Sequence, residues 1–144
     1  FHLYAAPGPL ALSPDGQNGL SMSFFEEHPP FTNNPVAAEF AKGYRERAAK
    51  AGLPYQEADQ QAANVFSSWQ VLAAAVTATK SLDDKVLTQW IKTNKVNTIY
   101  GLLRFDGQNN FGDDLTKVKQ VQKNKWVVVW PTEFAPPGVK MILQ

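Results

Sequence analysis

An apolar stripe over residues 61–79 constrains the fold of this chain more than any other feature of the sequence. Its side chains recur at the three- and four-residue spacing of a helix that is buried along one face. The stripe consists of Ala62, Val65, Phe66, Trp69, Leu72, Ala73 and Val76. The segment is also rich in alanine, so its helix can approach neighbouring elements closely. We expect a helix from about Gln61 to Thr79, with Trp69 packed in a core.

Two more helices are predicted on either side of this segment. Asn33-Asn34-Pro35 supplies a capping amide and a proline in the first turn, and Gly52 follows the last apolar position, so a helix should run from Pro35 to Ala51. Ser81 and Asp84 are spaced like a variant of the capping box. They predict a third helix that ends near Asn94.

The predicted strands are short and few. Leu20, Met22 and Phe24 alternate with serines, which predicts a strand that buries these three side chains. Further strands are expected at residues 1–4, 96–105, 118–122 and 125–130, the last two joined by a tight turn at Lys123-Asn124. This α/β set has too few strands to cover three apolar helices, so we expect part of the sheet to be missing upstream. The chain opens on Phe-His-Leu-Tyr, without a methionine or a leader, and we interpret it as a mature or clipped piece of a longer protein.

Composition excludes several classes of function. The net charge is +1, from 14 basic and 13 acidic residues that are well mixed, so no basic surface for nucleic acid or membrane is indicated. There are no cysteines, which excludes disulfides, thiol catalysis and cysteine-bound zinc. The longest apolar runs, residues 71–76 and 126–130, are far too short to span a bilayer.

No pattern of residues predicts a metal or catalytic site. Asp106, Gln108 and Asn110 have the spacing of calcium ligands, but Phe111 stands where the EF-hand requires glycine, so a plain polar turn is favoured. Neither His2 nor His28 has metal-ligand spacing to another residue. The pairs Glu26-Glu27, Asp83-Asp84 and Asp113-Asp114 adjoin turns or caps and are expected to be solvated. We therefore predict no enzyme activity and no cofactor.

Asn64 is the one unusual polar residue, because it lies among small and apolar neighbours near the start of the second helix. Two interpretations stay open. The amide could cap the helix or satisfy its first turn, or it could point into a cleft, where the backbone N–H groups at a helix start also favour carboxylates.

Several segments, in this order, resemble the C-terminal portion of periplasmic branched-chain amino acid binding proteins, the Leu/Ile/Val-binding receptors of ABC transporters. The most specific segment runs from Thr98 to Asp106, Thr-Ile-Tyr-Gly-Leu-Leu-Arg-Phe-Asp, which is close to the family's Thr-x-x-Gly-x-x-x-Phe-Asp. The other matching segments are Gly19-Leu20, the helix at 35–51, Ala63 to Trp69, Lys80 to Asp83, Val118 to Gln122 and Val128 to Pro131. Together they cover most of the chain.

The resemblance implies the type I periplasmic-binding-protein fold, an α/β architecture of two lobes that are joined by three crossovers and hold a ligand between them. The chain would be a partial copy, with C-terminal segments of both lobes. Residues 1–24 would end a second-lobe segment and its crossover. Residues 25–113 would form the C-terminal part of the first lobe, and residues 114–144 the last crossover and the C-terminal second-lobe strands.

The resemblance also implies a set of ligand contacts. It assigns Asn64 and Phe66 to the first-lobe side of the site and Tyr4 to the second-lobe side. After Tyr4 the family often has a glutamate that binds the ligand's amino group, whereas this chain has Ala5-Ala6-Pro7. The residues that clamp an α-carboxylate would lie in the absent N-terminal part. The implied ligand is therefore a small solute, either an amino acid or a small organic or aromatic acid.

The implied function is that of an exported, periplasmic substrate-binding component of a bacterial ABC transporter. Its partners would be the small-molecule ligand, the ABC permease of the inner membrane and the N-terminal remainder of the same protein. Two kinds of alternative stay open. One is a ligand-sensing domain of the same fold, and the other is a free-standing small interaction domain or a small enzyme.

Overall fold

The computed structural model describes residues 19–108, 115–123 and 125–143. These residues form two compact units. Unit 1 contains the described residues up to Gln60 and from Thr116 onward, and unit 2 runs from Gln61 to Leu115. The predicted strand at residues 1–4 and the Asp113-Asp114 pair lie outside the described residues.

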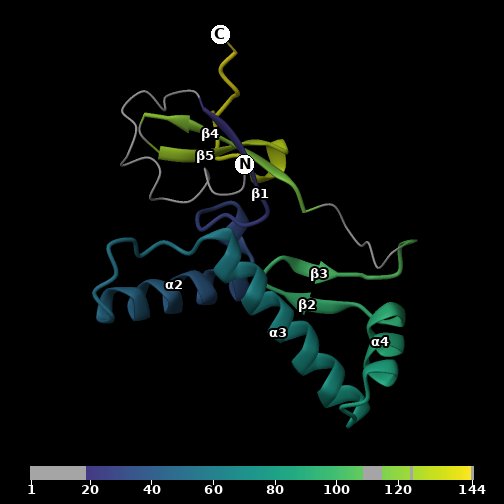
Figure 1. Ribbon diagram of the computed structural model, residues 1–144. Coiled ribbons are helices and arrows are strands. Elements are labelled where there is room, and N and C mark those ends of the chain that lie inside the picture. Colours follow the sequence, from purple (N-terminus) through teal and green to yellow (C-terminus); the bar gives the residue numbers. More distant parts are fainter. Residues whose placement is uncertain (1–18, 109–114, 124, 144) are drawn as a thin grey trace. The chain divides into compact units, whose positions relative to one another are not determined.

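Unit 1 contains an antiparallel sheet of three strands in the order β1-β4-β5 (Figure 1). The strands are β1 (Leu20–Ser23), β4 (Lys117–Gln122) and β5 (Lys125–Trp130). Leu20 lies opposite Gln120, and Ser23 lies opposite Lys117. The strands predicted at residues 118–122 and 125–130 are thereby confirmed.

The buried face of β1 is the reverse of the predicted one. Ser21 and Ser23 are buried, whereas Leu20 and Met22 are about half exposed. The Ser23 hydroxyl donates a hydrogen bond to the Phe25 carbonyl at 3.0 Å, so burial leaves this polar group satisfied. Alternation correctly predicted a strand, but it cannot tell which of two faces a packing partner covers.

The helix α2 (Pro35–Lys50) begins and ends as predicted. The Asn34 side chain accepts a hydrogen bond from Val36 N at 3.0 Å, and Gly52 follows the helix with a φ of +67°. Beside α2 lies an aromatic core, in which the Phe25 ring meets the rings of Phe31 and Phe40 edge to face. Two short 3₁₀ helices, η2 (Phe31–Asn33) and η4 (Thr132–Phe134), adjoin this core, and the Phe31 and Phe134 rings lie 5.8 Å apart.

Unit 2 contains most of α3 (Gln60–Thr79), α4 (Asp84–Thr93) and a hairpin of β2 (Val96–Thr98) and β3 (Gly101–Leu103). Both predicted helices are confirmed. The cap of α4 differs from the prediction, because Asp83 and not Ser81 accepts from the first free N–H groups, those of Lys85 and Val86. The Ser81 hydroxyl instead accepts from Asp83 N, one step before the cap. No described helix has the length and apolar character that crossing a bilayer requires.

The segment predicted as one interrupted strand, residues 96–105, is a tight hairpin of two strands. Gly101 has a φ of +90°, a value that glycine adopts without the strain a side chain would cause. The Thr98 hydroxyl donates to the Gly101 carbonyl and accepts from Tyr100 N, both at 3.1 Å. The turn is thus fixed by its own side chain, and Thr98 and Ile99 are fully buried.

Candidate functional site

A groove of about 440 Å³ lies within unit 2, between α3, α4 and the hairpin. Its lining is mostly apolar, with a few polar groups, as is common in small-molecule sites. The apolar lining residues are Val71, Leu72, Ile91, Leu103, Phe105 and Leu115, and the polar ones are Asn64, Ser67, Ser68 and Tyr100.

Asn64 lines this groove and forms a side-chain hydrogen bond that could not be predicted from the sequence. Its side-chain Oδ1 accepts a hydrogen bond from the Tyr100 hydroxyl, with 2.5 Å between the oxygens. The residue is the fifth of α3, and its side chain does not cap the helix. Of the two interpretations left open by the sequence, the helix-capping one is therefore wrong.

Tyr100 is held in place by the rigid turn on which it lies. Gln70 of α3 accepts a hydrogen bond from Ile99 N at 3.0 Å through its side-chain oxygen, which ties the turn to the helix. Burial also raises the pKa of the Tyr100 phenol, so it stays a neutral hydrogen-bond donor at physiological pH.

Of the other two predicted ligand contacts, the structure describes only Phe66. Phe66 lies on α3 but does not line the groove, and 40% of it is exposed. Tyr4 lies outside the described residues. Asn64, Ser67 and Ser68 have the spacing of one helix face, and this was the signal in the sequence that could have found the polar part of the groove.

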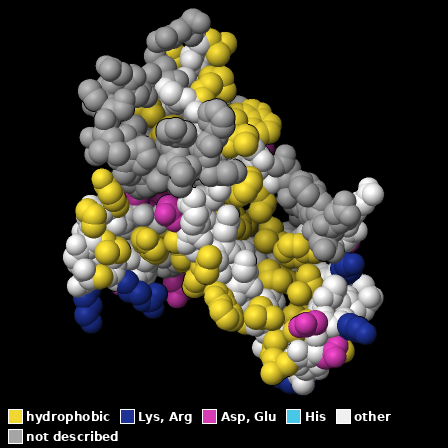
Figure 2. All heavy atoms as spheres, viewed as in Figure 1, with side chains coloured by type: hydrophobic (Ala, Val, Ile, Leu, Met, Phe, Trp, Pro, Cys, Tyr) yellow, Lys and Arg dark blue, Asp and Glu magenta, His cyan; other side chains and the backbone are white. Residues whose placement is uncertain are grey.

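The apolar stripe of α3 is largely uncovered, contrary to the predicted core packing of Trp69. Trp69 is 65% exposed and Val65 60% exposed, while the buried residues of the helix are Ala63, Ser67 and Ala75. Figure 2 shows hydrophobic side chains gathered along this helix. The buried face of the helix is the one with these small residues, because they allow close approach.

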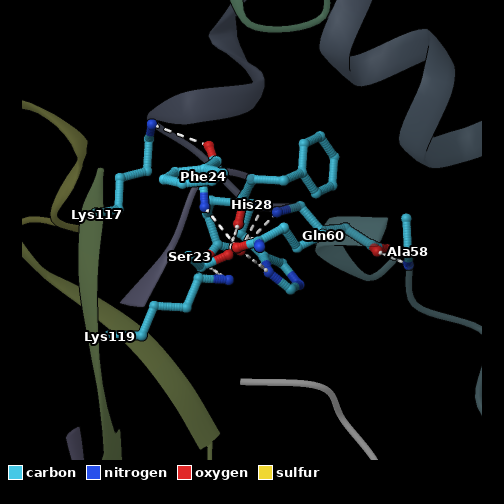
Figure 3. Close-up of polar contacts among 10 residues, drawn as sticks. Ser23, Phe24, His28, Ala58, Gln60, Lys117 and Lys119 are labelled. Atoms are coloured by element: carbon cyan, nitrogen blue, oxygen red, sulfur yellow. Dashed lines mark hydrogen bonds and ion pairs between the residues drawn. The ribbon is translucent and has the colours of Figure 1, made fainter. Parts of the chain in front are cut away.

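Unit 1 contains a second polar cluster, which is built around the carboxylate of Glu26. Its partners His28 and Lys119 are labelled in Figure 3. The carboxylate lies 3.0 Å from the Lys119 ammonium and accepts from the His28 ring Nδ1 at 2.9 Å. It also accepts from the backbone N–H groups of Glu27 and His28. Glu26 and Lys119 are buried, which corrects the prediction that the Glu26-Glu27 pair is solvated.

Glu27 is buried beside Glu26 but has different partners. It forms an ion pair with Arg45 at 2.6 Å and accepts from Ala58 N. Burial raises the pKa of Glu27, although the Ala58 N–H and the Arg45 charge oppose that rise. The two carboxylates of the pair are thus neutralised from different directions, one from β4 and one from α2.

Phe24 forms hydrogen bonds with two residues of unit 1 that lie just before and just after unit 2 in the sequence. Phe24 N donates to the Gln60 side chain at 3.0 Å, where α3 begins, and the Phe24 carbonyl accepts from the Lys117 ammonium at the start of β4 (Figure 3). That ammonium also lies over the rings of Phe31 and Phe134, at 4.9 and 4.6 Å from their centroids. The buried cations therefore have partners of their own and are not free to meet a ligand.

The two sites differ in their polar groups and in their openness. Among the residues that the structure describes, no three His, Asp or Glu side chains are placed to hold a metal ion. The Glu26 cluster is closed by internal hydrogen bonds, whereas the groove of unit 2 is open and has a mostly apolar lining. The groove is therefore the better candidate for contact with a small molecule.

Comparison with known proteins identifies the fold. No protein-family model matches the chain, and no curated protein matches it by sequence. The structure of a leucine binding protein, LivK, from Thermotoga maritima matches with a TM-score of 0.67 and 22% identity over 86% of this chain and 33% of that one. An ABC transporter substrate-binding protein from Desulfitobacterium hafniense, in complex with Leu, matches with a TM-score of 0.60 and 19% identity over 78% of this chain and 31% of that one.

These matches confirm the predicted fold class. The chain has part of the type I periplasmic-binding-protein fold, and it spans about a third of the length of the structures that it matches.

Proposed function

We propose that this chain is part of an exported, periplasmic solute-binding protein that captures a small molecule and delivers it to an inner-membrane ABC permease. The observation that carries the proposal is the fold. This chain shares it with a leucine binding protein and with an ABC transporter substrate-binding protein in complex with Leu. The solute would be an amino acid or a small organic or aromatic acid. Binding proteins hold such a solute without changing it, and no enzyme activity is proposed.

The groove of unit 2 supports this proposal at the level of residues. It combines an extended apolar lining with the Asn64 amide, and solute sites commonly have such a composition. We propose Asn64 as a hydrogen-bonding contact of the ligand, and we propose Phe66, which does not line this groove, and Tyr4 as apolar walls elsewhere in the ligand site. In the same proposal, residues 25–113 belong to one lobe, and residues 1–24 and 114–144 to the other.

The uncovered stripe of α3 supports a further partner, the N-terminal remainder of the same protein. None of the 20 residues of α3 is charged, and a helix of that kind is normally buried on most of its sides. Trp69 and Val65 would pack against that remainder.

The test is ligand binding by the full-length protein. A panel of amino acids and small organic acids should contain a solute that raises the free energy of unfolding, by about 2.7 kcal/mol when present at about 100 times its Kd. Calorimetry should give one site per chain. A panel that produces no thermal shift and no heat would overturn the proposal.

A further inference from the structure

The orientation of the Asn64 carboxamide determines which chemical groups this residue can recognise. Its contact with the Tyr100 hydroxyl measures 2.5 Å. That distance lies at the short end of the range of O–H···O bonds and below the usual range of N–H···O bonds. The oxygen of the amide therefore faces Tyr100, and the nitrogen faces the other way.

The amide nitrogen is left with donors to offer. An asparagine carries two N–H donors on Nδ2. Within the part of the chain that the structure describes, no group accepts a hydrogen bond from Asn64 Nδ2, and the half-buried residue lines the groove. A ligand in the groove thus meets a donor here and not an acceptor.

This orientation is maintained by the fold and not by Asn64 alone. Tyr100 lies on the turn that Thr98 closes, and Gln70 ties that turn back to α3, the helix that carries Asn64. Turning the amide over would take away the acceptor oxygen that the Tyr100 hydroxyl uses and would put N–H groups in its place. A hydroxyl that donates to Asn64 therefore favours one of the two amide orientations.

We infer that Tyr100 is a positioning residue that presents the Asn64 amide as a hydrogen-bond donor, and that the solute offers an acceptor oxygen at this point. The oxygen belongs to a carboxylate, a carboxamide or a carbonyl, and an ammonium group is disfavoured there. This inference rests on the proposed function and adds to it the polarity of one subsite.

The test uses three amino acids of similar size, with calorimetry on the full-length protein: leucine, asparagine and 2,4-diaminobutyrate. Asn64→Asp keeps an acceptor for Tyr100 and replaces the donors with a negative charge. If the solute's acceptor oxygen is on its side chain, the wild-type protein should bind asparagine more tightly than diaminobutyrate. Asn64→Asp should then shift the ratio of the two affinities by about tenfold or more toward diaminobutyrate. If the acceptor oxygen belongs to the α-carboxylate, Asn64→Asp should lower the affinities for leucine and for asparagine by about tenfold each.

Tyr100→Phe tests the positioning role. Without the Tyr100 hydroxyl the Asn64 amide can turn over, so the ratio of the affinities for asparagine and diaminobutyrate should become several-fold smaller. A residue with only a structural role would weaken all three probes by one common factor. Gln61→Glu is the matched control, because it makes the same chemical change at an exposed position of α3 that does not line the groove. It should leave the affinities unchanged.

The outcomes separate this inference from the function beneath it. Solutes that bind with affinities unchanged by Asn64→Asp would overturn the inference and leave the proposed function standing. The inference also fails if Tyr100→Phe lowers all affinities equally. If no probe and no other member of the wider panel binds, both fail together.

Discussion

Glu26 shows how a carboxylate can be buried and still keep its charge. Burial by itself raises the pKa of Glu26, but the hydrogen bond from His28 and the charge of Lys119 outweigh that effect and lower the pKa to about 2. Glu26 and Lys119 are both buried, so each depends on the charge of the other, whereas His28 contributes its hydrogen bond from an exposed position.

Replacing Glu26 should therefore be costly. Glu26→Gln leaves the Lys119 ammonium buried without a counter-charge, and we expect the free energy of unfolding to fall by about 3 kcal/mol. Urea denaturation measures it. Glu39→Gln, an exposed position on α2, is the control and should change stability by less than about 0.5 kcal/mol. Equal effects of the two substitutions would contradict this account of the cluster.

The same cluster predicts a window of maximum stability in pH. Folding lowers the pKa of Glu26 from 4.5 to about 2, so its contribution is complete above pH 4.5 and is lost as the pH falls toward 2. Folding raises the pKa of His28 from 6.5, mainly through its bond to Glu26 and also through the charges of Glu27 and Glu57. That contribution is complete below pH 6.5 and is lost as the pH rises through the raised pKa.

Thermal unfolding across this range checks the prediction. The difference in Tm between the wild type and His28→Gln should be largest between pH 4.5 and 6.5 and should shrink at higher pH. A difference that stays constant from pH 5 to pH 9 would show that the His28 charge contributes nothing.

At the scale of elements, Gln70 is one of the side chains of α3 that attach the hairpin to this helix. Gln70→Leu keeps the size of the side chain but removes the acceptor for the Ile99 N–H, at a fully buried residue. We expect a loss of about 1–3 kcal/mol, the cost of a buried donor without a partner. Gln89→Leu on the exposed side of α4 is the control for urea denaturation. If both variants unfold at the same urea concentration, the hydrogen bond from Ile99 N to Gln70 does not contribute to stability.

The helices could be predicted from the sequence because their signals are local. The Asn34 cap, Pro35 and Gly52 fix α2 through neighbouring residues alone, and the predicted bounds agree with the structure to within a residue. The hairpin at 96–103 was harder, because two strands of three residues are too short to show a period. The buried face of β1 could not be predicted, since it depends on residues about 95 positions away in β4.

The candidate site was predictable only in part. Asn64 was found because an amide among apolar residues is unusual. Its partner Tyr100 is 36 residues away, and only the hairpin turn brings the two together. The burial of Glu26 and Glu27 could not be predicted, because the cations that pair with them, Lys119 and Arg45, are also distant in sequence. Pairs of this kind require the fold before they can be recognised.

At the scale of the whole molecule, the uncovered stripe of α3 and the proposed N-terminal remainder together predict a difference between this chain and the longer protein proposed above. Trp69→Glu should cost less than about 0.5 kcal/mol in the 144-residue chain, where the side chain is 65% exposed. In the full-length protein we expect a loss of at least about 3 kcal/mol, because the charge would enter a covered apolar interface.

The control for this comparison is Thr77→Glu, at an exposed polar position of the same helix. It should have a small effect in both forms of the protein, as measured by chemical denaturation. If Trp69→Glu is equally mild in both, the stripe has no partner in the longer chain and the proposed packing is wrong.

The two buried lysines of β4 also give the folded chain a chemical signature. Reagents that acylate amines need a solvent-accessible amino group, and Lys117 and Lys119 are buried against their partners. Lys42, Lys85 and Lys92 are exposed and should be labelled first. The order in which lysines acquire the label would therefore report, peptide by peptide, whether β4 is seated in its sheet, without a ligand or any knowledge of the solute.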